Sequence, residues 1–477
     1  MKKRKQILLL CLSFFIIGQA QVTKSINVDV AGNLYTLLTF SEKTTVTDLT
    51  ISGSLDARDF KIIRDSMPVL SILDLSAVTI AAYNGANGTD IYGGQNYLEN
   101  TIPQFSFYKG NGIGKITLTT ITFPTTAISI GMNAFECCTG LASITIPNSI
   151  TSIGSATFAN CYELKSIILP NRITSIENAT FYDCFVLASI EIPNSVKTIG
   201  EYAFQDCEKL TTIIIPDSVT TIKKNAFQNC TSLTTITVPN SVTFIGDNAF
   251  GNINFYKDQP DGVIYVGKCA YKYKGDTLVN SNITIADGTT QLCYCAFYGR
   301  SDMISITIPN TVTSIGSMAF SRCMGLTTIT IPNSVDSIAE MAFYGCIGLK
   351  SLTINAVVPP VNLSYNTFQF VADTIPLIVP RGSLNAYNTT FCWSYFKNIQ
   401  EAPTSLTNVS ATSYSIHYQG RKIIIDNASN LGIQIFDISG RKVAEITKAS
   451  QNEILTVHAA GVYVIKVGNR SIKVIVE

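Results

Sequence analysis

The stretch CTGLASITIPNSITSIGSATFAN at residues 138–160 decides the fold, because it recurs in register with a period of 23 residues. Its first residue, Cys138, has counterparts at Cys161, Cys184, Cys207 and Cys230. The phenylalanine of the repeat keeps the same step at Phe135, Phe158, Phe181, Phe204, Phe227 and Phe250, and the step resumes at Phe297, Phe320 and Phe343. A period held over so many positions indicates a repeat protein, in which the other segments are caps, interruptions or appendages.

Each copy contains the motif Leu-x-x-Ile-x-Ile-Pro, found at residues 141–147 of the quoted stretch. Ile144 and Ile146 alternate with polar residues, which predicts a short strand with both isoleucines on one side. Pro147 has no N–H to donate and is expected to end the strand. One coil cannot bury its own apolar side, whereas stacked copies bury a continuous core. The strands are therefore predicted to form one parallel sheet with a spacing of about 4.8 Å per coil.

This motif resembles leucine-rich repeats, specifically the short BspA-like class found in surface proteins of Gram-negative bacteria. The resemblance covers residues 46–402. It implies a β-rich α/β solenoid, a right-handed leucine-rich-repeat coil with one parallel sheet. It also implies a function in adhesion to host matrix proteins such as fibronectin and fibrinogen, or in contacts between cells. Alternating strands after about Ser410 add a small C-terminal all-β sandwich domain.

The N-terminus predicts export. Basic residues 2–5 precede an apolar run at residues 7–17 and small residues before Gln21, which is typical of a signal peptide, with cleavage expected after Ala20. The run is too short for a typical membrane-spanning helix, and Cys11 lies inside it rather than at the cleavage site of a lipoprotein. Removal of residues 1–20 leaves 30 basic against 33 acidic residues and no basic patch, which argues against nucleic acid as a partner. We expect a protein that is secreted or held on the outer-membrane surface of a Gram-negative bacterium, with no membrane-spanning segment after signal removal.

The remaining boundaries follow from departures from the repeat. An N-terminal cap is predicted at residues 21–45 with one short helix at 34–40, followed by the first two strands at 49–53 and 73–76 and a helix at 59–67 between them. Interruptions are predicted at 83–114 and 251–296; the second contains strand-like pieces at 263–266 and 283–285, and Ala270-Tyr271 stands in for an Ala-Phe pair. A last strand at 375–380 precedes a C-terminal cap at 381–402. A linker at 403–409 and a β-sandwich at 410–477 complete the chain.

The residues that could carry chemistry argue against an enzyme. The chain has thirteen cysteines, and most share one repeat position, so they form a column that favours buried free thiols. One or two disulfides between coils, or a metal or redox role, are the alternatives. The two histidines, His417 and His458, both lie in the C-terminal domain, so the solenoid cannot assemble a Ser-His-Asp or Cys-His site. We expect no catalytic residue, no cofactor and no metal.

Two kinds of residue are candidates for ligand binding. Ile168, Glu191 and Ile214 lie between buried isoleucines and should point outward; they indicate either a broad binding face or ordinary strand propensity. The interruptions are rich in tyrosine, glycine and asparagine, a composition that suits recognition loops, although the tyrosines could instead pack back on the stack. The candidate tyrosines are Tyr83, Tyr92, Tyr97 and Tyr108 in the first interruption and Tyr256 and Tyr265 in the second.

The C-terminal domain carries a second resemblance, based on scattered residues rather than on a repeat. These residues are Asp437, Gly440, Arg441, Gly461, Tyr463, Lys466 and Lys473. They resemble the sorting domain of type IX secretion cargo, which implies recognition by export machinery at the outer membrane. A plain immunoglobulin-like accessory domain is the alternative.

These features predict a non-enzymatic secreted or cell-surface binding protein. Its partner is expected to be a host matrix or surface protein, bound through the solenoid face and the tyrosine-rich interruptions. The alternative is a structural or glycan-binding surface spacer with no protein receptor.

Overall fold

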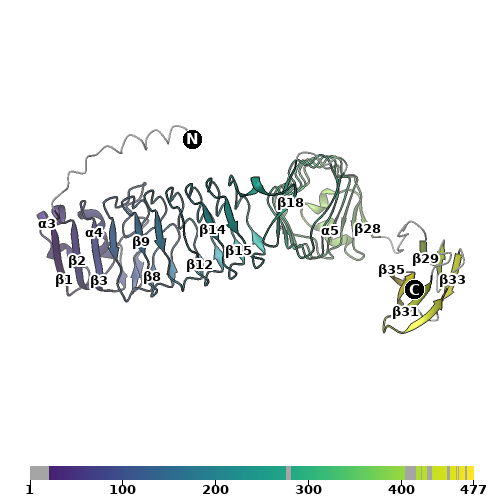
Figure 1. Cartoon of the computed structure of the whole chain (residues 1–477), viewed down its shortest axis with the longest axis horizontal. Helices are drawn as coiled ribbons and strands as arrows, with labels where there is room; N and C mark the ends of the chain where they lie inside the picture. The colour runs from purple at the N-terminus through teal and green to yellow at the C-terminus, as the bar shows by residue number, and fades with distance from the viewer. Residues whose placement is uncertain are drawn as a thin grey trace. The chain divides into compact units, whose positions relative to one another are not determined.

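The computed structural model describes residues 21–275, 281–402, 415–419, 422–426, 432–447, 452–457, 459, 461–467 and 470–476. The predicted signal peptide and the predicted linker at 403–409 lie outside the described residues. The chain divides into two compact units between Gln400 and Glu401. The first unit is a solenoid of stacked coils (Figure 1), and the second is a small β-domain.

The N-terminal cap differs from the prediction of a single helix. Strand β1 (Thr23–Val28) extends the sheet by pairing in parallel with β2 (Asp48–Leu55), so the predicted first strand is the second. The predicted helix at 34–40 is two helices, α2 (Leu34–Leu37) and α3 (Phe40–Thr45). Extended Thr39 separates them, because its side chain and that of Glu42 form a capping box that starts a new helix. The next elements, α4 (Ala57–Ser66) and β3 (Ile72–Ile80), lie where the sequence predicted a helix and a strand.

The regular coils contain two rows of parallel strands rather than one. The first row contains the Ile-x-Ile motif and comprises β7 (Thr120–Thr122), β9 (Ser143–Thr145), β11 (Ser166–Ile168), β14 (Thr212–Ile214), β16 (Thr235–Thr237), β20 (Ser281–Thr284), β22 (Met303–Thr307), β24 (Thr328–Ile331), β26 (Ser351–Ile354), β27 (Leu377–Val379) and β28 (Ile399–Glu401). The second row comprises β6 (Thr101–Ile102), β8 (Ser129–Ile130), β10 (Ser152–Ile153), β12 (Ser175–Ile176), β13 (Thr198–Ile199), β15 (Thr221–Ile222), β17 (Phe244–Ile245), β21 (Gln291–Leu292), β23 (Ser314–Ile315) and β25 (Ser337–Ile338). The pairing of Ser152 with Ser129 shows that partners in a row are one 23-residue period apart.

The prediction of a single parallel sheet is therefore incomplete. The second row arises from the second apolar pair of each repeat, such as Ile150 and Ile153, of which only Ile153 belongs to a strand. Strands of two residues are too short to show the alternation by which a strand is recognised in a sequence.

The phenylalanines form the centre of the core, as the repeat predicted. Phe158 and Phe181 are fully buried, and their ring centroids lie 5.8 Å apart with the ring planes 4° from parallel. The same stacked arrangement continues to Phe204, Phe227 and Phe250, with centroids 5.1–5.4 Å apart. Each ring thus packs only on the preceding and following coils, which makes the stability of the solenoid a sum of nearest-neighbour contacts.

Both interruptions contain a small antiparallel hairpin. In the first, β4 (Tyr83–Asn84) pairs with β5 (Asn96–Tyr97). In the second, the 3-10 helix η1 (Phe255–Asp258) precedes β18 (Gly262–Val266), which pairs with β19 (Cys269–Lys274). Strand β19 was not predicted, and its register aligns Ala270 with Leu292, so Ala270-Tyr271 does not occupy the Ala-Phe position in the ladder. The ring of Tyr271 nevertheless contacts Phe250 at 5.7 Å and continues the aromatic column.

The C-terminal cap covers the last coil with aromatic residues. Helix α5 (Leu384–Thr389) carries buried Tyr387, and the 3-10 helix η2 (Trp393–Tyr395) carries buried Trp393. The Tyr387 hydroxyl donates to the carbonyl of Ala356 at 2.7 Å, and the Trp393 indole N–H donates to the carbonyl of Pro360 at 3.0 Å. These bonds satisfy the polar atoms of two buried aromatic side chains, so this segment can close the apolar end of the stack.

The second unit consists of two antiparallel sheets. One contains β29 (Ser415–Gln419), β30 (Lys422–Asp426) and β33 (Asn452–Thr456); the other contains β32 (Lys442–Ile446), β31 (Ile433–Asp437), β34 (Gly461–Val467) and β35 (Arg470–Val476). Ile423 and Ile425 of one sheet share a buried cluster with Ile435 and Ile465 of the other. The unit is therefore a small sandwich.

Candidate functional site

The first candidate surface is the outward strand face, which we define by Thr145, Ile168, Glu191, Ile214 and Thr237. Each lies in the same position of its coil, between two isoleucines or their equivalents that point inward. Ile168 and Ile214 are 63% and 72% exposed. They pair with Thr145 and Thr237, respectively, on the neighbouring strands β9 and β16. The face therefore presents two aliphatic side chains on a framework fixed by parallel ladders.

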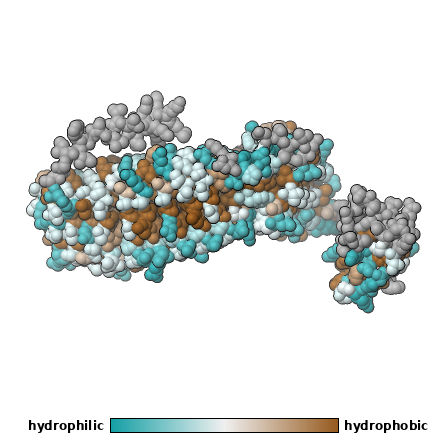
Figure 2. All heavy atoms as spheres, in the orientation of Figure 1, coloured by the Kyte–Doolittle hydropathy of each residue, from teal (hydrophilic) through white to brown (hydrophobic). Residues whose placement is uncertain are grey.

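Glu191 is also exposed, and it lies on the coil between Ile168 and Ile214. Residues 187–193 of this coil are not assigned to a strand, so the ladder is broken on both sides of Glu191. The result is an acidic side chain between two apolar ones. Figure 2 shows hydrophobic residues in a broken band along the side of the solenoid that faces the viewer, with hydrophilic residues on both sides of it.

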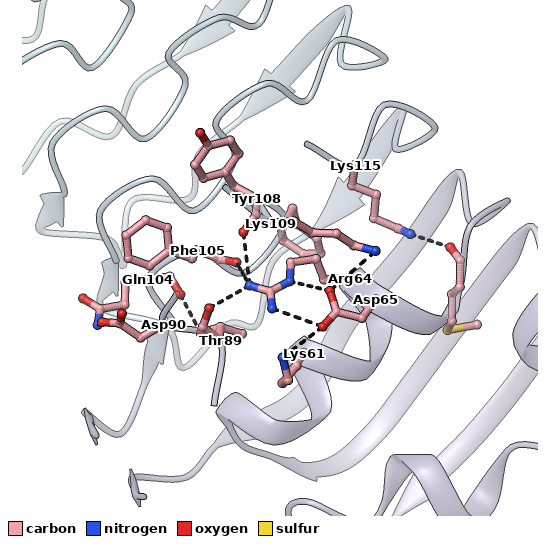
Figure 3. A network of polar contacts seen from close by, with 12 residues as sticks. Lys61, Arg64, Asp65, Thr89, Asp90, Gln104, Phe105, Tyr108, Lys109 and Lys115 are labelled. Atoms are coloured by element: carbon pink, nitrogen blue, oxygen red, sulfur yellow. Dashed lines mark hydrogen bonds and ion pairs between the residues drawn. The ribbon is translucent and has the colours of Figure 1, made fainter. Parts of the chain in front are cut away.

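The second candidate surface is the first interruption, whose backbone is fixed by Arg64 of α4 (Figure 3). The Arg64 side chain is almost completely buried, and its Nη1 donates to the carbonyl oxygens of Thr89 at 2.7 Å, Phe105 at 2.9 Å and Tyr108 at 3.1 Å. Its Nε and Nη2 donate to the two carboxylate oxygens of Asp65. One guanidinium thus connects the helix to three points of the interruption through charge-assisted hydrogen bonds.

The groups around Arg64 have perturbed ionisation. Burial by itself would raise the pKa of Asp65, but the hydrogen bonds and charges of Arg64 and Lys61 outweigh it and lower that pKa. Lys115 is buried and donates to the carbonyl of Met67, and burial lowers the pKa of this amine to about 8. Asp65 binds the side chains of Arg64, Lys61 and Lys109, and Lys115 binds the carbonyl of Met67, so both groups are occupied by contacts within the protein. We therefore assign the network a positioning role.

The four tyrosines of the first interruption do not form a common surface. Tyr97 and Tyr108 are buried, and burial raises the pKa of both hydroxyls. Tyr83 is half-buried, since its ring stacks on Tyr97 at 5.9 Å on one side and lies 4.7 Å from the Arg58 guanidinium. For Tyr97 and Tyr108 the structure therefore favours the second of the two alternatives, in which the rings pack back on the stack.

Tyr92 is the exception, because it is 85% exposed while its ring edge contacts Phe105 at 5.7 Å. Sequence alone could not separate Tyr92 from Tyr97, since both lie in the same polar, glycine-rich context. The difference arises from the contacts made by residues 89–108 with α4.

The two candidate tyrosines of the second interruption lie in different environments. Tyr256 is half-buried below the Lys272 amine, at 5.2 Å, and lines a cavity of about 130 Å³ with Tyr271 and Tyr294. Tyr265 is 37% exposed, and its hydroxyl accepts a hydrogen bond from the backbone N–H of Ala286 at 2.9 Å. The cavity is too small for a drug-sized ligand, which typically occupies about 300–1,000 Å³.

Sequence reasoning missed Arg64, although the signal was present. Phe60, Ile63 and Met67 have helical spacing and are buried, and Arg64 lies on the same face. A charged residue on the apolar face of a short helix predicts a buried partner. Its carbonyl partners, however, lie 25 to 44 residues further along the chain and could not be identified from spacing.

The cysteine column is buried, and the cysteines that the structure describes form no disulfide bond. The twelve cysteines that the structure describes are free thiols, and those of the regular coils are fully buried. Burial raises the pKa of Cys138 to about 12, which opposes formation of a reactive thiolate. Within the described part of the chain, His, Cys, Asp and Glu residues form no group of three that could hold a metal ion. The described residues also include no helix with the length and apolar character needed to cross a membrane.

The residues that resemble a sorting motif lie on neighbouring strands of one sheet. Asp437 and Gly440 form the turn between β31 and β32, and the Asp437 carboxylate accepts hydrogen bonds from the Arg441 side chain and backbone. Asp437 is paired with Tyr463 of β34. Tyr463 is buried, and its hydroxyl donates to the carbonyl of Ala459 at 2.8 Å. Tyr463 therefore packs in the core of this unit, whereas other motif residues on the strands are exposed.

The exposed members are the two lysines. Lys466 and Lys473 have solvent-exposed side chains on β34 and β35. Gly461, which starts β34, is partly buried.

Proteins similar to this chain are found among solved structures. No curated protein matches this chain. Among solved structures, a leucine-rich repeat protein from Bacteroides ovatus ATCC 8483 is 23% identical, with 75% of this chain and 84% of that chain covered and a TM-score of 0.37. A leucine rich cell surface protein from Faecalibacterium prausnitzii A2-165 is 18% identical, with 80% and 83% covered and a TM-score of 0.29. The pneumococcal vaccine antigen PcpA is 14% identical, with 82% and 91% covered and a TM-score of 0.25.

The family comparison covers the repeats themselves. A model described as BspA type leucine rich repeat region, with six copies, matches residues 100–209, 151–275 and 265–397. These matches together span more than half of the 477 residues. The chain therefore belongs to the BspA type leucine-rich-repeat family.

Proposed function

We propose that this chain is a non-enzymatic binding protein of the cell surface, and that its outward strand face attaches the cell to a host matrix protein or to another cell. The observation that carries the proposal is the exposure of Ile168 and Ile214 on either side of Glu191. Exposed aliphatic residues that a rigid framework holds in place are typical of interaction sites. The parallel ladders β9–β11 and β14–β16 fix the backbone of this face, so binding would require little ordering.

The experiment compares the unmodified chain that starts at Gln21 with two variants of it. Ile168→Thr with Ile214→Thr removes the aliphatic groups, while threonine keeps the β-branched shape that a strand favours. The control is Ile347→Thr, because Ile347 is 63% exposed on a different coil. Binding to immobilised extracellular matrix proteins and to whole cells is measured for all three proteins.

We expect the double variant to bind about thirtyfold more weakly, because two lost aliphatic contacts at roughly 1 kcal/mol each amount to about 2 kcal/mol, and we expect Ile347→Thr to bind normally. Equal binding by all three proteins would show that the outward strand face is not the binding site. Binding to polysaccharides without any binding to proteins would support the alternative, a glycan-binding or structural spacer.

The C-terminal domain supports a second part of the proposal, a role in export. Lys466 and Lys473 are exposed on neighbouring strands of a small sandwich that forms its own compact unit. A separate domain with its own core is suited to recognition by other machinery. We propose that a type IX secretion system reads this domain and delivers the chain to the outer-membrane surface of a Gram-negative cell.

A further inference from the structure

The C-terminal cap and the coil before it contain two groups of aromatic residues with opposite environments. Tyr387, Trp393 and Phe396 are buried and close the stack. Tyr365 and Phe391, by contrast, are 82% and 66% exposed. The first group explains the stability of the cap and leaves the second group without a structural role.

The exposed rings border an open cleft of about 270 Å³. Phe368, which is almost completely buried, also lines this cleft, together with Ser364 and Ser394. Tyr395 contributes a third ring, which is held in place because its hydroxyl donates to the carbonyl of Val371 at 2.5 Å. Within the described residues, neither Tyr365 nor Phe391 stacks on another ring, so their faces are available.

The lining has aromatic faces and hydroxyl groups but no charged side chain. The charges nearest Tyr395 neutralise each other, because Lys397 and Asp373 form an ion pair at 2.5 Å. A ligand that fits this lining must offer an apolar ring face together with hydroxyl groups, and it must be neutral. A pyranose sugar has this combination, since its axial C–H groups form an apolar face and its hydroxyls point outward from the ring edge.

We propose that the cleft between Tyr365, Phe391 and Tyr395 is a binding site for a neutral sugar residue of a glycan. The sugar stacks on the exposed rings, and the hydroxyls of Ser364 and Ser394 exchange hydrogen bonds with it. The site is on a different part of the chain from the outward strand face and does not depend on the function proposed for that face.

The chain offers a built-in probe for this site. Trp393 is the only tryptophan, and its ring lies 5.3 Å from Phe368, which lines the cleft. Tryptophan fluorescence of the chain that starts at Gln21 therefore reports on the cap alone. The probes are the methyl glycosides of glucose, galactose, mannose and N-acetylglucosamine, titrated through the ~1 mM range expected of a small ligand in an open site. A proline-rich peptide is titrated in parallel to test a polypeptide occupant.

We expect a saturable fluorescence change with at least one glycoside, and about tenfold weaker binding by Tyr365→Ser and by Phe391→Ser. Phe40→Ser, which changes an equally exposed aromatic ring elsewhere, should bind as the unmodified chain does. Thermal melting must be unchanged in all three variants, which the exposure of these side chains predicts.

Three results would overturn the proposal. The first is no response to any of the four glycosides, and the second is sugar binding that Tyr365→Ser and Phe391→Ser leave intact. The third is a response to the peptide alone, which would make the cleft a polypeptide site. The binding test on Ile168 and Ile214 is unaffected by any of these outcomes, so the two proposals fail separately.

Discussion

The thiol of Cys161 lies 3.2 Å from the carbonyl oxygen of Phe135, one coil earlier in the solenoid. The same contact recurs between Cys184 and Phe158 at 3.1 Å, and between Cys207 and Phe181 at 3.2 Å. Each of these carbonyls already accepts the backbone N–H of the cysteine three residues later, so the thiol of the following coil is a second, weak donor to it inside the core.

Thiol labelling tests this arrangement. Cys161, Cys184 and Cys207 are fully buried, and burial raises the pKa of each thiol, so we expect almost no labelling of the native protein near neutral pH. Full labelling is expected after unfolding in urea without a reductant. Half-buried Cys295 serves as the internal comparison and should react first. Detection of disulfides between adjacent coils by mass spectrometry would contradict the prediction.

The aromatic column should carry a large share of the stability. Phe181→Ala and Phe204→Ala each remove a fully buried ring that stacks on both neighbours, at 5.8 and 5.3 Å for Phe181. We expect each substitution to lower the free energy of unfolding by about 3–5 kcal/mol, because it leaves a cavity that rigid coils cannot close. Urea unfolding measures this change. A loss below about 1 kcal/mol would mean that the rings are not packed as described.

Tyr92 and Tyr97 should differ when each is replaced by serine. Tyr97 is 6% exposed and its hydroxyl accepts from the backbone N–H of Asp90 at 2.8 Å, whereas Tyr92 is 85% exposed. Tyr97→Ser is expected to reduce stability by about 3 kcal/mol, and Tyr92→Ser to change it by less than about 0.5 kcal/mol. Thermal melting of the two variants measures these changes. Similar melting curves for both variants would show that the first interruption does not pack on its coil.

How much the sequence predicts depends on whether a residue lies inside the repeat. The burial of Phe181 and Cys184 follows from the 23-residue step, because identical coils must stack with identical residues in contact. Strand β1 was missed because its alternation is partly polar and it precedes the first leucine motif. Tyr97 and Arg64 could not be assigned either, since their environments are made by contacts between segments that the repeat does not relate.

The same limit applies to the proposed sugar site. Tyr365 and Phe391 lie 26 positions apart, which differs from the 23-residue period, so the repeat does not align them. The cap brings them to one cleft by folding residues 384–395 over the last coil. Sequence reasoning recognised the cap from its tryptophan and tyrosines but could not divide these rings into buried and exposed groups.

Asp183 should make stability depend on pH. It lies one coil from Asp206; burial, followed by the negative charges of Asp206 and Glu208, raises its pKa to about 6. A carboxyl with a raised folded-state pKa binds its proton more tightly in the folded protein, so its contribution to stability is present at low pH. That contribution is lost as the pH rises from about 4 to about 6.

The test is Asp183→Asn, which cannot ionise. Asparagine already occupies this repeat position at Asn160 and Asn229, with the same left-handed backbone. We expect the variant to have a higher urea midpoint than the unmodified chain at about pH 7, and a nearly equal one at about pH 4. A variant that is less stable at both pH values would show that the carboxylate is favourable where it lies.

The last prediction concerns the division of the chain between Gln400 and Glu401. The solenoid ends in a cap whose buried Trp393 and Tyr387 both have hydrogen-bond partners on the last coils, at the carbonyls of Pro360 and Ala356. The solenoid should therefore not need the second unit for its stability. Deletion of residues 403–477 is expected to leave the melting temperature of the solenoid nearly unchanged. If the solenoid unfolds instead, the second unit is part of the cap and the division is not a domain boundary.

The same deletion tests export in the native host. If the C-terminal unit is read by secretion machinery, the truncated chain should remain in the periplasm, whereas the full chain should reach the cell surface. The control is Lys466→Ala with Lys473→Ala in the full chain, because both side chains are exposed and their loss leaves the buried cluster around Ile435 and Ile465 intact. Retention of this variant in the periplasm would assign recognition to the exposed lysines. Normal surface delivery of the truncated chain would show that the C-terminal unit is an accessory domain and that export depends on another part of the chain.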